Sequence, residues 1–553
     1  MEKPWFSSYE KGVPHTINEK EYSSIVDILE SSFSKFGDRP AFHCMGKTLD
    51  FSDMDELSKK FASFLQNNLK LKKGARVALM MPNILQYPVA LFGILRAGMV
   101  AVNVNPLYTE RELEHQLKDS GAEAIVIFAN SAKILENVIE KTDVKHVIVT
   151  QIGDMLGFPK SLLVNFVIKH VKKMVPAWEL EDHIKFLDAL ALGDASKFKR
   201  ETPTLEDTAF LQYTGGTTGV SKGAELTHGN IVANMVQARA WISGVIKEGQ
   251  EIIITPLPLY HIFSLTANCF IFSSVGALNV LITNPRDIPG FVKELSKWKF
   301  TAFTGVNTLF NALLNNKEFK DLDFSSLKLT LGGGMAVQKA VAQEWKSTTG
   351  KPLIEAYGLT ETSPAACINP MSLAEFNGKI GIPIPSTDVK IIDDEGKEVG
   401  INEPGELAIK GPQVMKGYWN RPEETEKVFT EDGYFKTGDI ACVDEKGFFQ
   451  IVDRKKDMIL VSGFNVYPNE VEDVIVTHPK VMEAAAIGVP HDKSGEVVKV
   501  FIVKKEGEEV SEDEIMQFCK KELTGYKCPK MIEFRDELPK SNVGKILRKD
   551  LRS

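Results

Sequence analysis

The sequence has few cysteines and no pattern that would pair them. The six cysteines form no C-x-x-C pair and no zinc-type spacing; they are Cys44, Cys269, Cys367, Cys442, Cys519 and Cys528. This scarcity excludes a disulfide framework and favours reduced thiols in a reducing compartment. The opening Met-Glu-Lys-Pro-Trp lacks the apolar stretch of a secretory signal, and the closing Leu-Arg-Ser is not a peroxisomal address. We therefore expect a cytoplasmic protein.

The chain also lacks an excess of positive charge. It has 74 acidic and 66 basic residues, for a formal net charge of -8. A general binder of nucleic acid or of anionic membrane needs a broad basic surface, so the composition argues against both classes. Any anionic ligand must then be met by a local cluster of donors.

Long uncharged segments are rare, and the exception is residues 252–285. This segment is long enough to raise the question of a membrane span. Prolines and polar residues interrupt it, which indicates a loop, a buried helix and a strand inside a large core. The interrupting residues are Pro256, Pro258, His261, Asn268 and Gly276.

The remaining composition is that of a large globular α/β protein. The chain has 553 residues, of which 43% are hydrophobic and 25% charged. This length predicts about three to four domain-sized units. A large α/β body can absorb several of these units, and one small partner domain would then complete the chain. Short apolar strands alternate with helical periods, as is typical of parallel α/β folds. Thr109 and Glu112 predict a capping box at the start of one crossover helix, and Gly121 predicts its end. The expected strands span residues 77–81, 100–104, 124–128 and 146–150.

The pattern changes twice toward the C-terminus. Residues 381–452 combine short strands with turn signals, which predicts an antiparallel, β-barrel-like subdomain. After Asp453, helix signals at Pro468 and at the Ser511/Glu514 capping box flank two strands, which predicts a small α+β domain. We expect an N-terminal domain of residues 1–453 and a mobile C-terminal domain of residues 454–553. The two strands are expected near residues 484–489 and 497–501.

Candidate chemistry begins at residues 213–224, Tyr-Thr-Gly-Gly-Thr-Thr-Gly-Val-Ser-Lys-Gly-Ala. The glycines let backbone N–H groups converge on an anion, while hydroxyls and Lys222 add donors and charge. The segment is not a Walker A motif, because Ser221 precedes the lysine and Gly223 follows it. A polyphosphate fits this loop; the alternative is a Gly/Thr-rich loop without function.

Four further clusters follow in order. Tyr357-Gly-Leu-Thr-Glu361 places a carboxylate that could hold Mg²⁺ beside a triphosphate. Tyr434-Phe-Lys-Thr-Gly-Asp439 ends in an acidic residue able to accept ribose hydroxyls. Either cluster alone could be a plain turn. Residues 453–470 lie where the pattern changes and are interpreted as a hinge, and residues 539–545 form a lysine-bearing loop.

Together these clusters resemble the adenylate-forming superfamily of acyl-CoA synthetases, luciferases and peptide-synthetase adenylation domains, from about residue 25 to the end of the chain. Residues 462–472, Ser-Gly-Phe-Asn-Val-Tyr-Pro-Asn-Glu-Val-Glu, are similar to the fatty-acyl signature, and residues 155–178 are similar to a segment of bacterial long-chain fatty-acid-CoA ligases. The resemblance implies ATP, Mg²⁺ and coenzyme A, with a fatty acid activated as an acyl-adenylate.

The resemblance also implies residue roles. Tyr357 would stack on adenine, Thr360 would contact the α-phosphate, and Glu361 would hold Mg²⁺. Asp439 and Arg454 would bind the ribose. The β- and γ-phosphates would be bound by the loop that comprises Tyr213, Thr214, Gly215, Gly216, Thr217, Thr218, Gly219, Val220, Ser221 and Lys222.

Lys545 would bridge the fatty carboxylate and the α-phosphate. Like-charge repulsion opposes the attack of a carboxylate on a phosphate, and a lysine between them stabilises the transition state more than the separated reactants. No covalent nucleophile is needed, since the acid's own oxygen attacks. For the second step we expect rotation about Lys456 to bring Gly463 toward a tunnel for the pantetheine arm.

The acyl side is predicted from two segments. His261 matches the family's histidine beside the carboxylate, although a lone histidine among apolar residues can be a core group. Some family members carry an aromatic gate four positions later, where this chain has Leu265. A glycine run is expected to let the alkyl chain pass close to the backbone, or else to form a plain turn. The run is Gly332, Gly333 and Gly334.

Alternatives remain at this stage. A luciferase-type oxygenase uses the same adenylation chemistry, and a non-catalytic nucleotide sensor would lack Lys545 or Glu361. A medium-chain or aryl acid is the other substrate class, and a homodimer is left open. Residues 160–175 predict a helix with a broad apolar face and a lysine side, which suits either reversible contact with a membrane surface or packing on the body.

Overall fold

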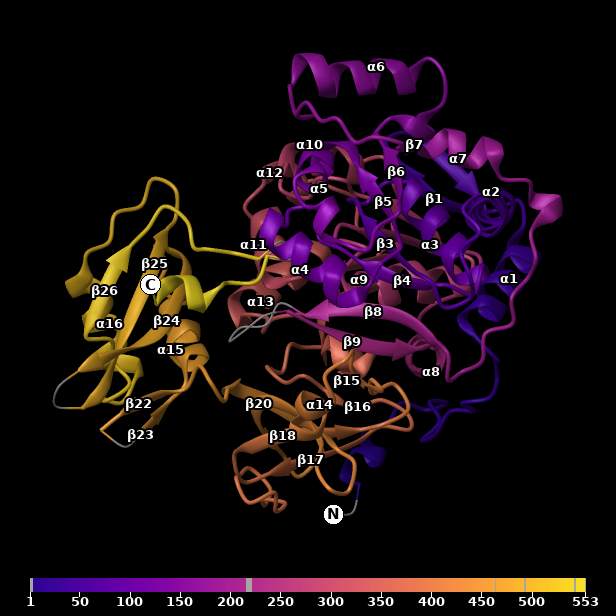
Figure 1. The fold of residues 1–553 in the computed structure, drawn as a ribbon. Helices are drawn as coiled ribbons and strands as arrows, with labels where there is room; N and C mark the ends of the chain where they lie inside the picture. The colour runs from indigo at the N-terminus through magenta and orange to yellow at the C-terminus, as the bar shows by residue number, and fades with distance from the viewer. Residues whose placement is uncertain (1–2, 215–220, 463, 492–493, 542–543, 553) are drawn as a thin grey trace.

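The computed structural model describes residues 3–214, 221–462, 464–491, 494–541 and 544–552. A main body holds the N-terminal part of the chain, an antiparallel sheet lies below it, and a smaller C-terminal domain, drawn in yellow, lies to one side (Figure 1). The fold is mixed α/β with two large, mainly parallel sheets, as the sequence predicts.

The first large sheet has eight strands in the order β19-β9-β8-β4-β3-β5-β6-β7. In this order, the neighbours in the run β8-β4-β3-β5-β6-β7 pair in parallel. The pairs β8–β9 and β9–β19 are antiparallel. The four predicted strands are β3 to β6, each within one residue of the expected bounds. The strands are β3 (Arg76–Met80), β4 (Val100–Asn103), β5 (Ala124–Phe128), β6 (His146–Thr150), β7 (Ile184–Lys185), β8 (Thr208–Thr214), β9 (Lys222–Thr227) and β19 (Gly417–Tyr418).

Helix α4 (Glu110–Ser120) confirms the predicted crossover between β4 and β5. Thr109 accepts a hydrogen bond from the backbone N–H of Glu112, whose side chain accepts one from the N–H of Thr109. Gly121 ends the helix with φ 59°, a left-handed conformation that glycine adopts without strain. The capping residues therefore set both ends of this helix.

The second large sheet has nine strands in the order β16-β15-β14-β13-β12-β10-β11-β1-β2. Its strands from β14 to β1 are parallel, and the outer pairs are antiparallel. The strands are β1 (Pro40–Cys44), β2 (Lys47–Asp50), β10 (Ile252–Thr255), β11 (Leu278–Leu281), β12 (Ala302–Gly305), β13 (Leu329–Gly332), β14 (Leu353–Gly358), β15 (Ala365–Ile368) and β16 (Ile382–Pro383).

Buried helices connect the two large sheets. Helix α8 (His228–Ile242) packs on β9 and on the π-helical segment η8 (Leu265–Phe272), which in turn packs on β10 and β11. The uncharged segment 252–285 thus supplies two buried strands and a buried helix. Across the described ranges, the structure has no helix whose length and apolar character would let it span a bilayer.

The other helices cover the sheets and the antiparallel region. They are α1 (Ile25–Phe36), α2 (Phe51–Ser63), α3 (Gln86–Arg96), α5 (Ala132–Glu136), α7 (Phe186–Leu192), α9 (Ile262–Ser264), α10 (Ile288–Leu295), α11 (Asn307–Leu314), α12 (Lys317–Lys320), α13 (Lys339–Thr349) and α14 (Pro422–Val428).

The antiparallel region corrects one expectation. Strands β17 (Asp388–Ile392), β18 (Gly405–Lys410), β20 (Phe435–Val443) and β21 (Phe449–Arg454) form a sheet in the order β17-β18-β20-β21. Within the described residues this sheet is open, and its outer strands β17 and β21 do not pair to close a barrel. Four strands are too few to curl into a closed barrel, so the sheet instead covers an apolar face on the main body.

The C-terminal domain has its own sheet and its own core. Strands run in the order β23-β22-β25-β24, and β26 pairs with β25. Two helices cover the sheet, α15 (Pro468–Ile475) and α16 (Glu512–Glu522), the latter capped by the Ser511 side chain. Both begin where the sequence signals predict. The strands are β22 (Ile459–Val461), β23 (Phe464–Val466), β24 (Val481–His491), β25 (Gly495–Lys504) and β26 (Met531–Phe534).

One helix stands away from the rest of the molecule. Helix α6 (Lys160–Phe166) continues into the π-helical segment η6 (Val167–Val171), and neither has a buried residue. Figure 1 shows α6 at the top, separate from the body. Leu162, Leu163, Phe166 and Val171 are exposed on this segment, whereas Val164, Val167 and Ile168 are half-buried.

Candidate active site

A continuous cavity of about 2320 Å³ is lined by the main body, the antiparallel sheet and the C-terminal domain. Its lining includes residues of β8, β14, β20 and α15, together with Lys545. One part is polar. Another part is lined by apolar side chains of α8, β10, η8 and β13, including Ile242, Ile253, Ile271 and Leu331. The cavity therefore joins a polar chamber to an apolar arm.

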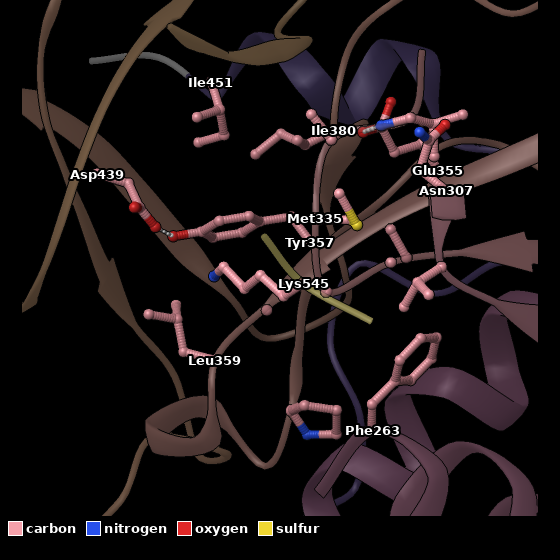
Figure 2. Close-up of a pocket in the computed structure, with 18 of the residues that line it drawn as sticks. Phe263, Asn307, Met335, Glu355, Tyr357, Leu359, Ile380, Asp439, Ile451 and Lys545 are labelled. Carbon is pink, nitrogen blue, oxygen red and sulfur yellow. Dashed lines mark hydrogen bonds between the residues drawn. The ribbon is translucent and has the colours of Figure 1, made fainter. Parts of the chain in front are cut away.

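Tyr357 and Asp439 lie together in the polar chamber. The phenol of Tyr357 donates a hydrogen bond of 2.6 Å to Asp439 Oδ2 (Figure 2). Asp439 is opposite Arg454 in the β20–β21 pairing, and Arg454 Nε lies 3.5 Å from Asp439 Oδ1. Burial, reinforced by Asp439, raises the pKa of the Tyr357 phenol well above its ordinary value. The predicted base-stacking and ribose-binding residues are thus adjacent in space.

Lys545 enters the same chamber from the C-terminal domain, with its side chain between Tyr357 and Leu359 (Figure 2). Its backbone is held on the main-body side, because Thr308 Oγ1 donates a 3.0 Å hydrogen bond to the carbonyl of Gly544. Desolvation by the surrounding protein, followed by the charge of Arg454, lowers the pKa of Lys545 to about 7. The ammonium is therefore poorly compensated until an anion reaches it.

His261 also lines the cavity and faces the charge of Lys545. It caps α9, and its Nδ1 accepts a hydrogen bond of 3.3 Å from the N–H of Phe263. Desolvation lowers its pKa to about 4, with a smaller contribution from Lys545. The imidazole is therefore neutral at physiological pH, and it can donate a hydrogen bond without adding charge.

Thr360 and Glu361 lie on the short 3-10 segment η9 (Thr360–Thr362). Glu361 is buried, and its Oε1 accepts a 2.8 Å hydrogen bond from the hydroxyl of Tyr418. Desolvation raises the pKa of Glu361. Magnesium beside a polyphosphate needs only one or two protein carboxylates, the phosphates and water supplying the rest. The single carboxylate of Glu361 fits that requirement.

The ends of the predicted phosphate loop are on the β8–β9 hairpin. Ser221 Oγ donates to the carbonyl of Thr214, and Lys222 Nζ lies 2.6 Å from Glu424 Oε2. The Tyr213 phenol donates to Asp119 at 2.7 Å, so its hydroxyl is already used by the protein. The other predicted loop residues lie outside the described residues; they are Gly215, Gly216, Thr217, Thr218, Gly219 and Val220.

The predicted acyl-side residues are placed in two layers. Gly333 and Gly334 line the cavity, and a Cβ on Gly333 would lie 3.2 Å from the ring of Phe263. Gly332 packs instead against Leu353, and Leu265 is fully buried in η8. An aromatic side chain that lines the cavity next to Gly333 is Phe263, which lies two residues after His261 (Figure 2).

The predicted hinge residues are only partly described. Lys456 is exposed and follows β21, and Gly463 lies outside the described residues. Arg548 joins this region to the segment after Lys545. Its guanidinium binds Glu472 at 2.7 Å and Asn469 at 2.6 Å.

Several cavity residues had no signal in the sequence. Thr308, Tyr418 and Glu424 act through partners distant in the chain, so no local motif marks them. Glu355, beside Asn307 in Figure 2, is buried, and burial raises its pKa to about 8. Alternation along β14 places Glu355 on the same face as Tyr357, which is the pattern that could have identified it.

Residues 29–419 match the AMP-binding enzyme family, and residues 470–545 match the AMP-binding enzyme C-terminal domain. The first match alone spans more than half of the chain. The chain belongs to the AMP-binding enzyme family.

Relatives and solved structures agree with this family. The long-chain-fatty-acid–CoA ligase of Escherichia coli O157:H7 is 58% identical over 100% of this chain and 98% of its own length. The long-chain-fatty-acid–CoA ligase of Bacillus subtilis strain 168 is 40% identical over the same shares. The crystal structure of the anthranilate CoA ligase AuaEII with anthranoyl-AMP superposes with a TM-score of 0.86 at 26% identity, covering 97% of this chain and 98% of that one.

Proposed function

We propose that the chain is a long-chain fatty-acid–CoA ligase, which converts ATP, a fatty acid and CoA to acyl-CoA, AMP and pyrophosphate through an acyl-adenylate. The observation that carries this proposal is the cavity that joins a polar chamber to an apolar arm, with Lys545 in the chamber. The names of the 58% and 40% identical relatives support the substrate class. A medium-chain or aryl acid is the second candidate, supported by the anthranilate-ligase neighbour.

In the first half-reaction, we assign nucleotide binding to the polar chamber. Tyr357 stacks on adenine, and Asp439 and Arg454 bind the ribose hydroxyls. Thr360 contacts the α-phosphate. The loop from Thr214 to Lys222 binds the β- and γ-phosphates. At the described end of this loop, Ser221 supplies a hydroxyl and Lys222 supplies a positive charge.

Lys545 and His261 act on the reacting groups in this assignment. The Lys545 ammonium lies between carboxylate and α-phosphate and stabilises the charge of the transition state. The neutral His261 orients the carboxylate by a hydrogen bond. Glu361 would hold Mg²⁺, which would neutralise phosphate charge when bound.

For the second half-reaction, we propose that the chain divides at residues 453 and 454, and that the C-terminal domain rotates about Lys456. The rotation removes Lys545 from the chamber and brings Gly463 toward a tunnel for the CoA pantetheine arm. A small residue suits a passage for a thiol. Exposed Lys456 at the end of β21 is compatible with a hinge.

A pyrophosphate-release assay tests the function directly. With palmitate and ATP, the protein should release pyrophosphate, and thioester should appear only when CoA is added. Replacing palmitate with octanoate or benzoate compares the substrate classes, and palmitate should give the highest kcat/KM. Release of pyrophosphate without thioester in the presence of CoA would contradict ligase activity, and a preference for benzoate would favour the aryl alternative.

We also propose a cytoplasmic protein that contacts membrane reversibly through residues 155–178. Free thiols at all six cysteines support a reducing compartment. On α6 and its flanks, Phe158 is 84% exposed and Leu162 64%, and Lys169, Lys172 and Lys173 follow nearby. Lysines near anionic lipid contribute about 1 kcal/mol each. A fatty-acid substrate itself partitions into membranes, which makes this location useful.

Co-sedimentation with vesicles tests the contact. The wild type should sediment with vesicles of 30% phosphatidylserine at low salt, more than a Lys169/Lys172/Lys173→Glu variant, and both should remain in solution at high salt. A Leu162→Ser/Phe166→Ser variant separates the apolar from the charged contribution. Equal sedimentation of wild type and triple variant would remove the basis of the proposal.

A further inference from the structure

Lys222 is bound by a carboxylate of the protein itself. Its Nζ lies 2.6 Å from Glu424 Oε2, and Lys427 Nζ lies 2.8 Å from Glu424 Oε1. Each oxygen of Glu424 therefore has a cationic partner. Hydrogen bonds from Lys222 and then from Lys427 lower the pKa of Glu424 to about 2, so the carboxylate is fully charged at physiological pH.

The ion pair lies inside the cavity, close to the group assigned to the metal. Lys222 Nζ is 5.0 Å from the centroid of the Tyr418 ring, and the hydroxyl of Tyr418 donates to Glu361. Lys222, Tyr418, Glu361 and Glu424 all line the same cavity. Tyr418 therefore contacts both Lys222 and Glu361.

This arrangement has an electrostatic consequence for polyphosphate binding. An anion that binds Lys222 either displaces Glu424 or brings a second negative charge close to it, and both cost free energy. When pyrophosphate leaves, Glu424 can form its ion pair with the Lys222 ammonium again. A carboxylate 202 residues away in the chain is therefore suited to limit how tightly the lysine holds a phosphate.

We propose that Glu424 is a positioning residue that competes with phosphate for Lys222, so that ATP and pyrophosphate bind less tightly and pyrophosphate is released more readily. This inference rests on the proposed function, because it assigns Lys222 to the polyphosphate. The alternative is an ion pair that serves stability only.

The Glu424→Gln variant separates the two. Gln keeps the shape of the side chain and removes its charge. Pyrophosphate and ATP should each bind two- to fivefold more tightly than to the wild type in calorimetric titrations, the range expected for a screened surface ion pair. The gain should shrink as KCl is raised, because salt screens the competition. KM for ATP should fall without a rise in kcat.

A second background makes the test specific to Lys222. In a Lys222→Met protein, adding Glu424→Gln should raise pyrophosphate affinity by clearly less than it does in the wild-type background, since the residue competed for is absent. Glu423→Gln is the matched control: it neutralises the neighbouring exposed carboxylate of α14 and should change affinity by less than Glu424→Gln does.

Each result is decisive. Unchanged or weaker pyrophosphate binding in Glu424→Gln, or an equal gain in the Lys222→Met background, overturns the competition. Weaker binding together with a lower melting temperature assigns the pair to stability. A wild-type protein that binds neither ATP nor pyrophosphate would refute the proposed function instead, so the two failures are distinguishable.

Discussion

Among the described residues, Lys545 has more cationic than anionic groups acting on it. Arg454 lies close enough to lower its pKa further, and Asp439 offsets this only in part. With a pKa of about 7, the lysine loses its proton as the pH rises through neutrality. The ammonium that we assign to adenylation is thus present below pH 7 and lost above it, and bound ATP and carboxylate would restore it by adding negative charge.

The first prediction concerns pH. In the adenylation half-reaction, kcat/KM should fall by about tenfold per pH unit above pH 7, because it reports the free enzyme, whereas the fall in kcat should begin at higher pH. Pyrophosphate release at saturating and at low ATP measures both. In Lys545→Arg, the alkaline fall should disappear, since a guanidinium stays charged. Identical profiles in wild type and Lys545→Arg would show that another group titrates.

The second prediction concerns Gly333, where a Cβ would lie 3.1 Å from the carbonyl of Ala356 and 3.2 Å from the Phe263 ring. Gly333→Ala must push Phe263 aside, so KM for palmitate should rise by about tenfold while KM for ATP stays within twofold. Steady-state kinetics with each substrate varied checks this. The control is Gly525→Ala, where an added Cβ meets nothing within 4 Å. An equal rise in both KM values would instead mean that the whole site is distorted.

At the scale of elements, Arg548 fastens the short helix η10 (Arg548–Leu551) to α15 and to the end of β21. It donates to Glu472, and its Nη1 lies 3.7 Å from Asp453 Oδ1 and 3.6 Å from Asp457 Oδ2. Lys545 lies shortly before Arg548 in the chain. The position of Lys545 therefore depends on a cationic side chain held among three buried carboxylates.

The third prediction is that Arg548→Ala lowers the stability of the C-terminal domain by about 3–5 kcal/mol, because those carboxylates lose their partner. The rate of adenylation should fall strongly, whereas the rate at which supplied acyl-adenylate is converted to thioester should fall less. Thermal unfolding and the two half-reaction assays measure this. Arg552→Ala, which removes the pair with Asp457 alone, should have a smaller effect on both. Equal losses in both half-reactions would mean that Arg548 does not position Lys545.

Local signals predicted elements better than they predicted assemblies. Thr109, Glu112 and Gly121 set the ends of α4 through bonds within a few residues, so the sequence was sufficient there. The barrel expectation was wrong because alternation identifies strands but not which strands close on each other. The contacts of Lys222 with Glu424 and of Thr308 with Gly544 join residues 202 and 236 positions apart, and no spacing in the sequence encodes them.

At the scale of the whole molecule, side-chain hydrogen bonds join the C-terminal domain to the main body away from the hinge region. Thr308 donates to Gly544, and Asn311 Nδ2 lies 3.5 Å from the carbonyl of Met482. Hydrogen bonds of this kind are replaced by water at low net cost, so the observed arrangement can be left without a large barrier from these contacts. In this arrangement Lys545 lines the polar chamber, and we propose that the thioester step uses a different arrangement of the two domains.

The fourth prediction follows from the proposal that the two half-reactions use different arrangements of the domains. Lys545→Ala should abolish acyl-adenylate formation but still convert supplied acyl-adenylate and CoA to thioester, because we assign the lysine to the first step only. Gly463→Leu should do the reverse, since a larger side chain would obstruct the pantetheine arm after rotation while leaving Lys545 in place. Separate assays of pyrophosphate release and of thioester formation from synthetic acyl-adenylate measure the two steps. If both variants depress both half-reactions to the same degree, one fixed arrangement of the domains must serve both steps, and the rotation about Lys456 is then unnecessary.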